Sequence, residues 1–98
     1  MKIDVEEEAQ RLNLKLKGRL DTTTAPQLDL VIKEKINGIT DLQLDFKELE
    51  YISSAGLRVI LSALKRMKSQ GTMVIRNVRE EIMEVFTITG FADILTIE

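Results

Sequence analysis

Two adjacent serines, Ser53 and Ser54, are the residues whose type and position point most directly to chemistry. They precede the small pair Ala55-Gly56 and an amphipathic segment, so a strand end is expected to lead through them into a helix. Ser54 is expected to be the N-cap, its side chain accepting from the amide of Gly56 or Leu57. The same amides and the positive end of the helix dipole also stabilise an added phosphate. Ser54 is therefore a candidate both for a cap and for a phosphoacceptor.

Two charged residues accompany these serines as candidates. Asp21 follows a strand pattern and precedes Thr22-Thr23-Thr24, which favours a role in a turn or in capping. Arg58 follows Ser54 by about one turn of the expected helix. It is either a solvated helix residue or a group that approaches a phosphate or a partner. The local sequence leaves both interpretations open.

The residue types that are missing exclude several kinds of site. The 98 residues contain no Cys, His or Trp. A disulfide framework, a zinc finger, a histidine metal site and a Ser-His-Asp or Cys-His nucleophile are therefore excluded. No motif places a general base beside a nucleophile, and no glycine-rich phosphate loop is present. We expect neither an enzyme nor a bound metal or cofactor.

Charge and hydropathy place the chain in a broad class. Fourteen basic and sixteen acidic residues give a net charge of −2, which argues against a nucleic-acid-binding face. The N-terminus lacks the apolar region of a signal peptide, and no stretch approaches the roughly 18 apolar residues of a membrane span. We expect one domain over residues 1–98, monomeric, cytoplasmic and without membrane contact.

Hydrophobic periodicity predicts the elements that position these residues. Alternating or short apolar runs predict strands at 3–5, 12–16, 42–46, 73–75 and 94–97, with a first turn at 8–10. Helices are expected from 24 to about 38, from 54 to 70 and from 77 to 90. Residues 24–27 and 77–80 resemble capping boxes. The helices are expected to end at Gly38, Gly71 and Gly90, with Gly71 in a left-handed conformation.

The order β-β-α-β-α-β-α-β defines an α/β fold with a mixed, mainly parallel sheet. Strands joined through helices favour parallel pairing with right-handed crossovers. Apolar and polar residues alternate at 12–16 and 42–46, whereas strands covered on both faces would be apolar throughout. The helices are therefore expected to pack on one face of the sheet only.

Three motifs stand out along the chain: Gly18-Arg19-Leu20-Asp21, Leu44-Asp45-Phe46 and Ser53-Ser54-Ala55-Gly56-Leu57. Together they resemble those of STAS domains, and more narrowly those of bacterial anti-sigma factor antagonists. The resemblance extends over essentially the whole chain. It implies a right-handed β-α superhelix with an additional N-terminal strand. Family members usually continue into a final helix, so we expect the apolar surface near Ile94 and Ile97 to be less protected here.

The resemblance also implies a phosphorylation switch. Antagonists of this family bind an anti-sigma factor that is also a serine kinase; phosphorylation by that kinase abolishes binding, and a PP2C-type phosphatase restores it. Alignment on Gly56-Leu57 places the acceptor at Ser54, with Ser53 in place of the family's aspartate and Ala55 in place of its Ser or Thr. The partner-binding residues so implied are Asp21, Thr22, Ser53, Ala55, Gly56 and Arg58. The alternative is a STAS accessory subunit of a lipid or solute transporter, in which Ser54 need not be phosphorylated.

Overall fold

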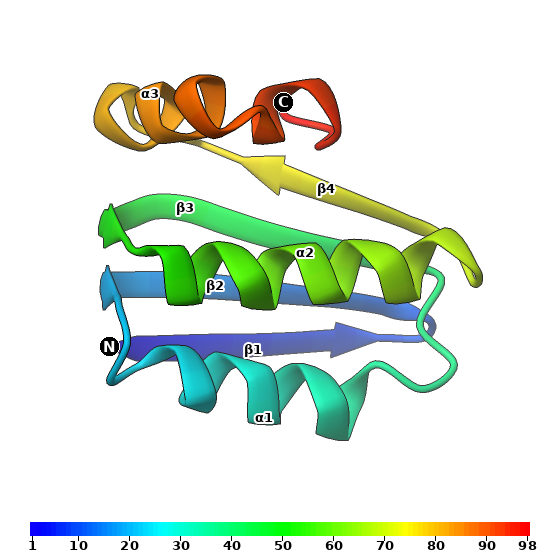
Figure 1. Ribbon diagram of the computed structural model, residues 1–98. Coiled ribbons are helices and arrows are strands. Elements are labelled where there is room, and N and C mark those ends of the chain that lie inside the picture. The colour runs from blue at the N-terminus through cyan, green and yellow to red at the C-terminus, as the bar shows by residue number, and fades with distance from the viewer.

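A four-stranded sheet carries the helices of this chain (Figure 1). The computed structural model describes all residues, 1–98. In chain order the elements are β1 (Lys2–Glu8), β2 (Arg11–Leu20), α1 (Ala25–Lys35), β3 (Asp41–Ile52), α2 (Ser54–Lys68), β4 (Thr72–Arg76), α3 (Glu80–Thr89) and the 3₁₀ helix η1 (Phe91–Asp93). None of the helices combines the length and the apolar character needed to cross a membrane.

The strands lie in the spatial order β1-β2-β3-β4. β1 and β2 form an antiparallel hairpin, whereas β2, β3 and β4 are parallel. The hairpin turns at Ala9, whose φ of 53° lies in the left-handed region. The expected mixed, mainly parallel sheet is confirmed, because each parallel pair is joined through a helix.

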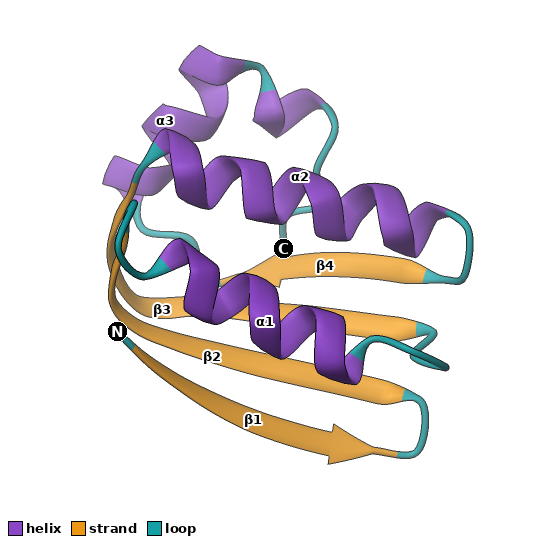
Figure 2. Ribbon diagram, turned by 60° about the horizontal axis from the view of Figure 1, so that its bottom comes forward, coloured by secondary structure: helices purple, strands orange, loops and turns teal.

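All three helices cover the same face of the sheet, as Figure 2 shows. The register pairs Leu12 with Leu42 and Leu14 with Leu44, and all four side chains are fully buried beneath the helices. Gln43, between two of these leucines, points to the uncovered face and stays half-buried. Every fully buried side chain is hydrophobic. The alternation in the sequence therefore reports a sheet covered on one side, as expected.

Aromatic and aliphatic side chains join the helices to this sheet. α2 buries the apolar face formed by Leu57, Ile60, Leu64 and Met67. α3 contributes Phe86, whose ring centroid lies 6.2 Å from that of Phe46 on β3 and 6.5 Å from that of Phe91. Pairs at this separation stabilise a core beyond simple burial of area.

The predicted strand at 94–97 is wrong. Residues 91–93 form η1, and the chain reaches the edge of β4 only at its last residues, where Ile97 makes a single parallel bridge with Ile75. The Ile75 amide donates to the Thr96 carbonyl at 2.9 Å, and the Glu98 amide donates to the Ile75 carbonyl at 2.9 Å. Ile94 is 47% exposed, whereas Ile97 is half-buried and packs against the core.

Neither predicted capping box forms. The Thr24 hydroxyl accepts from the Asp21 amide at 2.8 Å and donates to the Arg19 carbonyl at 2.8 Å, while the Gln27 side chain donates to the Met1 carbonyl at 3.2 Å. At the other site Asn77 adopts a φ of 58° and donates to Asp45. The Thr24 hydroxyl thus bonds within its own loop, whereas the side chains of Gln27 and Asn77 bond to partners distant in sequence instead of forming local caps.

The three glycines that were expected to end helices differ in backbone conformation. Gly90 ends α3 in a left-handed conformation with a φ of 82°, as expected for a helix stop. Gly38 has a φ of 80°, but α1 already ends at Lys35. Gly71 is not left-handed; a Cβ there would overlap the carbonyl of Thr40. Close backbone approach, rather than a positive φ, explains the glycine at position 71.

Candidate regulatory site

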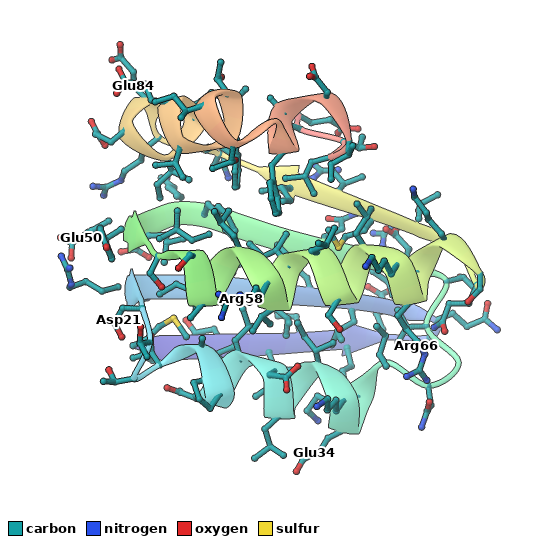
Figure 3. The ribbon with its side chains drawn as sticks, in the orientation of Figure 1. Asp21, Glu34, Glu50, Arg58, Arg66 and Glu84 are labelled. Atoms are coloured by element: carbon teal, nitrogen blue, oxygen red, sulfur yellow. The ribbon has the colours of Figure 1, made fainter.

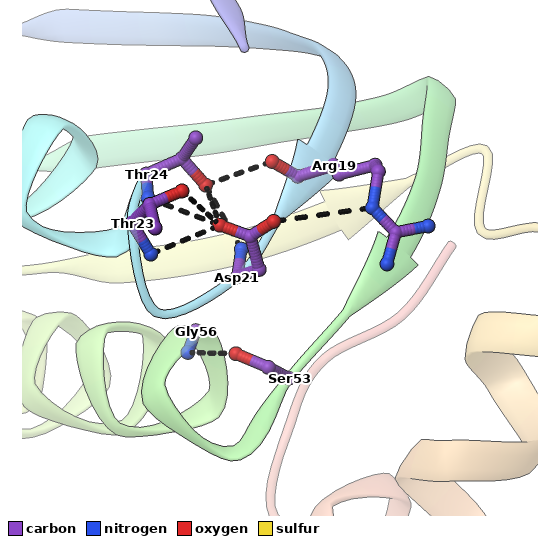
Figure 4. A network of polar contacts seen from close by, with 6 residues as sticks. All are labelled: Arg19, Asp21, Thr23, Thr24, Ser53 and Gly56. Atoms are coloured by element: carbon purple, nitrogen blue, oxygen red, sulfur yellow. Dashed lines mark hydrogen bonds and ion pairs between the residues drawn. The ribbon is translucent and has the colours of Figure 1, made fainter.

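The candidate site lies where β2 and β3 end and α1 and α2 begin. β2 and β3 are parallel neighbours, so their carboxyl ends lie at the same edge of the sheet. The loop Asp21–Thr24 follows β2, and the Ser53–Gly56 segment follows β3. The amide of Ser53 donates to the carbonyl of Leu20 at 2.9 Å and links the two segments directly. Figure 4 shows them side by side.

Ser53, rather than Ser54, is the N-cap of α2, so the expected cap is one residue too late. Ser53 is extended, with φ −97° and ψ 174°, and its hydroxyl accepts from the Gly56 amide at 3.4 Å. Because β3 continues to Ile52 and Ser53 keeps its extended conformation, the first helical residue is Ser54. Two consecutive serines gave no local signal to choose between them.

Ser54 is exposed at the first position of α2, and its hydroxyl makes no hydrogen bond. The amides of Ser54 and Ala55 also have no backbone acceptor, since no helical turn precedes them. The first turn contains no acidic residue. The hydroxyl of Ser54 thus stands free at the positive end of a helix, where an added phosphate is electrostatically favourable.

Asp21 organises the neighbouring loop. Its carboxylate accepts from the Thr23 hydroxyl at 2.7 Å, from the Thr23 amide at 3.0 Å and from the Thr24 amide at 3.2 Å. These hydrogen bonds, that of the Thr23 hydroxyl first, hold the pKa of Asp21 below its ordinary value against the opposing effect of burial. Of the two expected roles of Asp21, the turn is confirmed, whereas the N-cap of α1 is Thr24. The loop presents an ionised carboxylate.

The remaining predicted residues differ in accessibility. Thr22 and Arg58 are exposed, and Ala55 is half-buried. Gly56 is buried, and a Cβ there would lie 2.7 Å from Cγ of Leu20 and 3.0 Å from Cγ1 of Ile52. The glycine therefore lets α2 approach the ends of β2 and β3. Asp21, Thr22, Ser53, Ser54 and Ala55 come together at one edge, with Arg58 further along α2.

The Arg19–Tyr51 pair lies beside this site and did not emerge from the sequence as a functional pair. The Arg19 guanidinium stacks over the Tyr51 ring at 4.1 Å from its centroid, and Arg19 Nε lies 3.9 Å from an Asp21 carboxylate oxygen. Tyr51 is 40% exposed. Arginine and tyrosine are enriched among the residues that dominate binding at protein interfaces. The register that pairs Arg19 with Tyr51 includes a shift beside Gly18, which strand patterns do not predict.

The surface around Ser54 is not hollowed. None of the cavities in the structure is lined by Asp21, Ser53 or Ser54. No group of His, Cys, Asp or Glu side chains is arranged to hold a metal ion. An open surface with a free hydroxyl and a fixed carboxylate is suited to a protein partner rather than to an enclosed small molecule.

The fold and this edge together define a small α/β domain of the kind that the STAS family comprises. The family model for the STAS domain matches residues 2–98, and the chain belongs to that family. It is 30% identical to the anti-sigma-B factor antagonist of Bacillus subtilis strain 168, over 97% of this chain and 88% of that protein. It is 36% identical to BtrV of Bordetella bronchiseptica strain RB50, over 84% of this chain and 72% of that protein.

Solved structures agree with the family assignment at the level of the fold. The anti-sigma factor antagonist SpoIIAA in its unphosphorylated form matches with a TM-score of 0.79 and 18% identity, over 99% of this chain and 87% of that one. The Bacillus cell fate determinant SpoIIAA in its phosphorylated form matches with a TM-score of 0.78 and 19% identity, over 99% and 91%. The expected STAS fold is confirmed.

Proposed function

We propose that this protein is an anti-sigma factor antagonist that binds an anti-sigma factor serine kinase while Ser54 is unphosphorylated. The observation that carries the proposal is the exposed, unbonded hydroxyl of Ser54 at the start of α2, in a chain whose relatives include a named anti-sigma-B factor antagonist. Binding the anti-sigma factor would release the sigma factor. Since sigma factors act on RNA polymerase, the proposal requires a cytoplasmic location.

Ser54 is proposed as the phosphoacceptor because Ser53 has a different task. The Ser53 hydroxyl is half-buried and bonded to the Gly56 amide, whereas that of Ser54 is exposed and free for a kinase. Aspartate and serine are both good N-caps, so Ser53 serves in the position where the family has aspartate. The substitution removes a charge from the loop while leaving the acceptor at the same place in the helix.

The proposed partner surface surrounds this hydroxyl. Asp21, Thr22, Ser53, Ala55 and Arg58 contribute the accessible groups, and Gly56 contributes the close packing that positions them. The hydrogen bonds within the Asp21 loop favour binding, because a loop that is already ordered loses less entropy on association.

The switch acts by blocking this surface. A phosphate on Ser54 brings about −1.5 to −2 charges. The helix dipole offsets typically 0.3–1 kcal/mol of the cost of burying them, whereas a buried, unpaired ion costs several kcal/mol. A net loss of about 3 kcal/mol already weakens binding roughly a hundredfold. No change of fold is needed.

The proposal includes a PP2C-type phosphatase as the enzyme that restores the unphosphorylated form. The protein itself is proposed to act by binding and not by catalysis. The transporter-accessory alternative is not favoured, because the curated relatives that share most of the chain are named anti-sigma factor antagonists.

The experiment that tests the acceptor is phosphosite mapping by mass spectrometry. The protein is incubated with ATP and the anti-sigma factor kinases of its own source. We expect one phosphoryl group on Ser54 in the wild-type protein and none in Ser54→Ala, which should remain folded and still bind the kinase. Modification at Ser53 would contradict the assignment of the acceptor. The absence of modification by every such kinase would contradict the switch itself.

A further inference from the structure

Arg58 is the one arginine in the chain without a polar partner. It is exposed on α2, and its guanidinium makes neither a hydrogen bond nor an ion pair. Figure 3 shows Arg58 toward the same end of the molecule as Asp21. The other five arginines each contact a carboxylate, a carbonyl or an amide oxygen: Arg11 with Asp41, Arg19 with Asp21, Arg66 with Asn37, Arg76 with Glu98, and Arg79 with the carbonyl of Lys47.

The surroundings of Arg58 leave its charge uncompensated. The first turn of α2 carries no acidic residue, so nothing on this helix balances a cation close to the positive end of the dipole. On the neighbouring segments, Asp21 is held by Thr23, Thr24 and Arg19, and Asp29 of α1 pairs with Lys33 at 2.8 Å. In the unphosphorylated protein no carboxylate lies within ion-pair distance of the Arg58 guanidinium, and both of these aspartates have other partners.

Phosphorylation of Ser54 would supply that anion. Residues four apart on a helix lie on the same side with about 5–6 Å between their Cβ atoms, and an acidic group N-terminal to a basic one is the favoured order. Both Ser54 and Arg58 are exposed, so both side chains can move in solvent toward one another. The planar guanidinium can donate two parallel hydrogen bonds to phosphate oxygens.

We propose that Arg58 is the internal counter-ion of a phosphate on Ser54 and stabilises the phosphorylated state. The inference rests on the proposed acceptor role of Ser54 and names its regulation. The pair also withdraws the guanidinium from the partner surface once the phosphate is present. Phosphorylation then both adds a charge to that surface and removes a hydrogen-bond donor from it.

The test uses the protein carrying phosphoserine at position 54, inserted during translation, so that no kinase is required. The second pKa of the phosphate, near 6 for phosphoserine, is measured by ³¹P NMR in the wild-type background and in Arg58→Gln. We expect the wild-type phosphate to ionise at a pH lower by roughly half a unit, because a nearby cation favours the dianion. Lys65→Gln is the matched control, since exposed Lys65 lies about three turns from Ser54.

Equal phosphate pKa values in the wild-type and Arg58→Gln backgrounds would overturn the proposal, and so would an equal shift in Lys65→Gln. A second readout is the urea midpoint, which phosphorylation should raise more in wild-type protein than in Arg58→Gln. The NMR result can fail or succeed independently of the proposed function. If kinase mapping placed the phosphate elsewhere, the acceptor assignment would fail, whereas the NMR result would still decide whether Arg58 pairs with a phosphate at position 54.

Discussion

The two serines at the start of α2 have separate roles, whereas the sequence analysis expected Ser54 to be both the N-cap and the candidate phosphoacceptor. Ser53 caps the helix, and Ser54 presents a free hydroxyl. The sequence predicted a serine cap and a small, close-packed Ala-Gly pair, and both are present. It did not identify which serine caps, because that depends on how far β3 continues, which is a property of the sheet and not of the dipeptide.

Replacing the cap tests this division. Ser53→Ala is expected to lower the free energy of unfolding by about 1 kcal/mol or somewhat less, since the bond to the Gly56 amide is long at 3.4 Å. Ser53→Asp should preserve stability, because aspartate is an equally good cap and complements the dipole. Urea denaturation measures both, with exposed Ser62→Ala on the same helix as the control. An unchanged midpoint in Ser53→Ala would show that the cap contributes nothing.

For the stability of Gly56→Ala, packing and helix propensity predict opposite effects. Alanine is the better helix former by about 1 kcal/mol, but a Cβ at position 56 would lie 2.7 Å from Leu20 Cγ. We expect Gly56→Ala to destabilise the protein by about 1–3 kcal/mol through overpacking and to shift α2 away from the Asp21 loop. Thermal denaturation should show a lower Tm; a raised Tm would mean that the helix tolerates the methyl group.

For the strands, the sequence predicted the positions of those with one buried face. It failed to predict strand ends and edge contacts, which depend on contacts between elements. The alternation at 12–16 and 42–46 identified β2 and β3, but both strands continue further, to Leu20 and Ile52. Shifts of register after Lys15 and Gly18 interrupt the alternation there. The strand expected at 94–97 was wrong because a four-residue run with three apolar side chains does not distinguish a strand from a segment that touches β4 once.

The Asp21 carboxylate is expected to make the free energy of unfolding depend on pH. Because folding lowers the pKa of Asp21 below its ordinary value of 3.8, the stabilisation is present above that value and is lost as the pH falls through the folded-state pKa. Asp21→Asn should therefore have a lower urea midpoint than the wild type at pH 6, and the difference should shrink below about pH 4. A difference that stays constant down to pH 2.5 would show that the charge of Asp21 has no part in stabilising the loop.

The whole molecule is a sheet with one buried and one uncovered face, and its core contains no buried polar side chain. The SpoIIAA structures in the unphosphorylated and phosphorylated forms match this chain with nearly equal TM-scores, 0.79 and 0.78. That the candidate residues lie at the carboxyl ends of parallel strands was predictable in outline, whereas their exact contacts depend on the register.

Phosphorylation is accordingly expected to leave the fold unchanged. In ¹⁵N–¹H NMR spectra of the protein with and without phosphoserine at position 54, shifts should be confined to the Asp21 loop and the first turns of α2. Amides of the β1–β2 turn at 9–10, at the opposite end of β2 from the site, serve as the internal control. Widespread shifts across β1 and β4 would contradict a switch that acts by blocking a surface.

The affinity of the two forms for the anti-sigma factor kinase tests the central claim most directly. Calorimetric titration compares unmodified protein with protein carrying phosphoserine at position 54, both with the kinase of the same source. The account predicts binding by the unmodified form and at least roughly hundredfold weaker binding by the phosphorylated form, as expected for about 3 kcal/mol. Equal affinity of the two forms would contradict it.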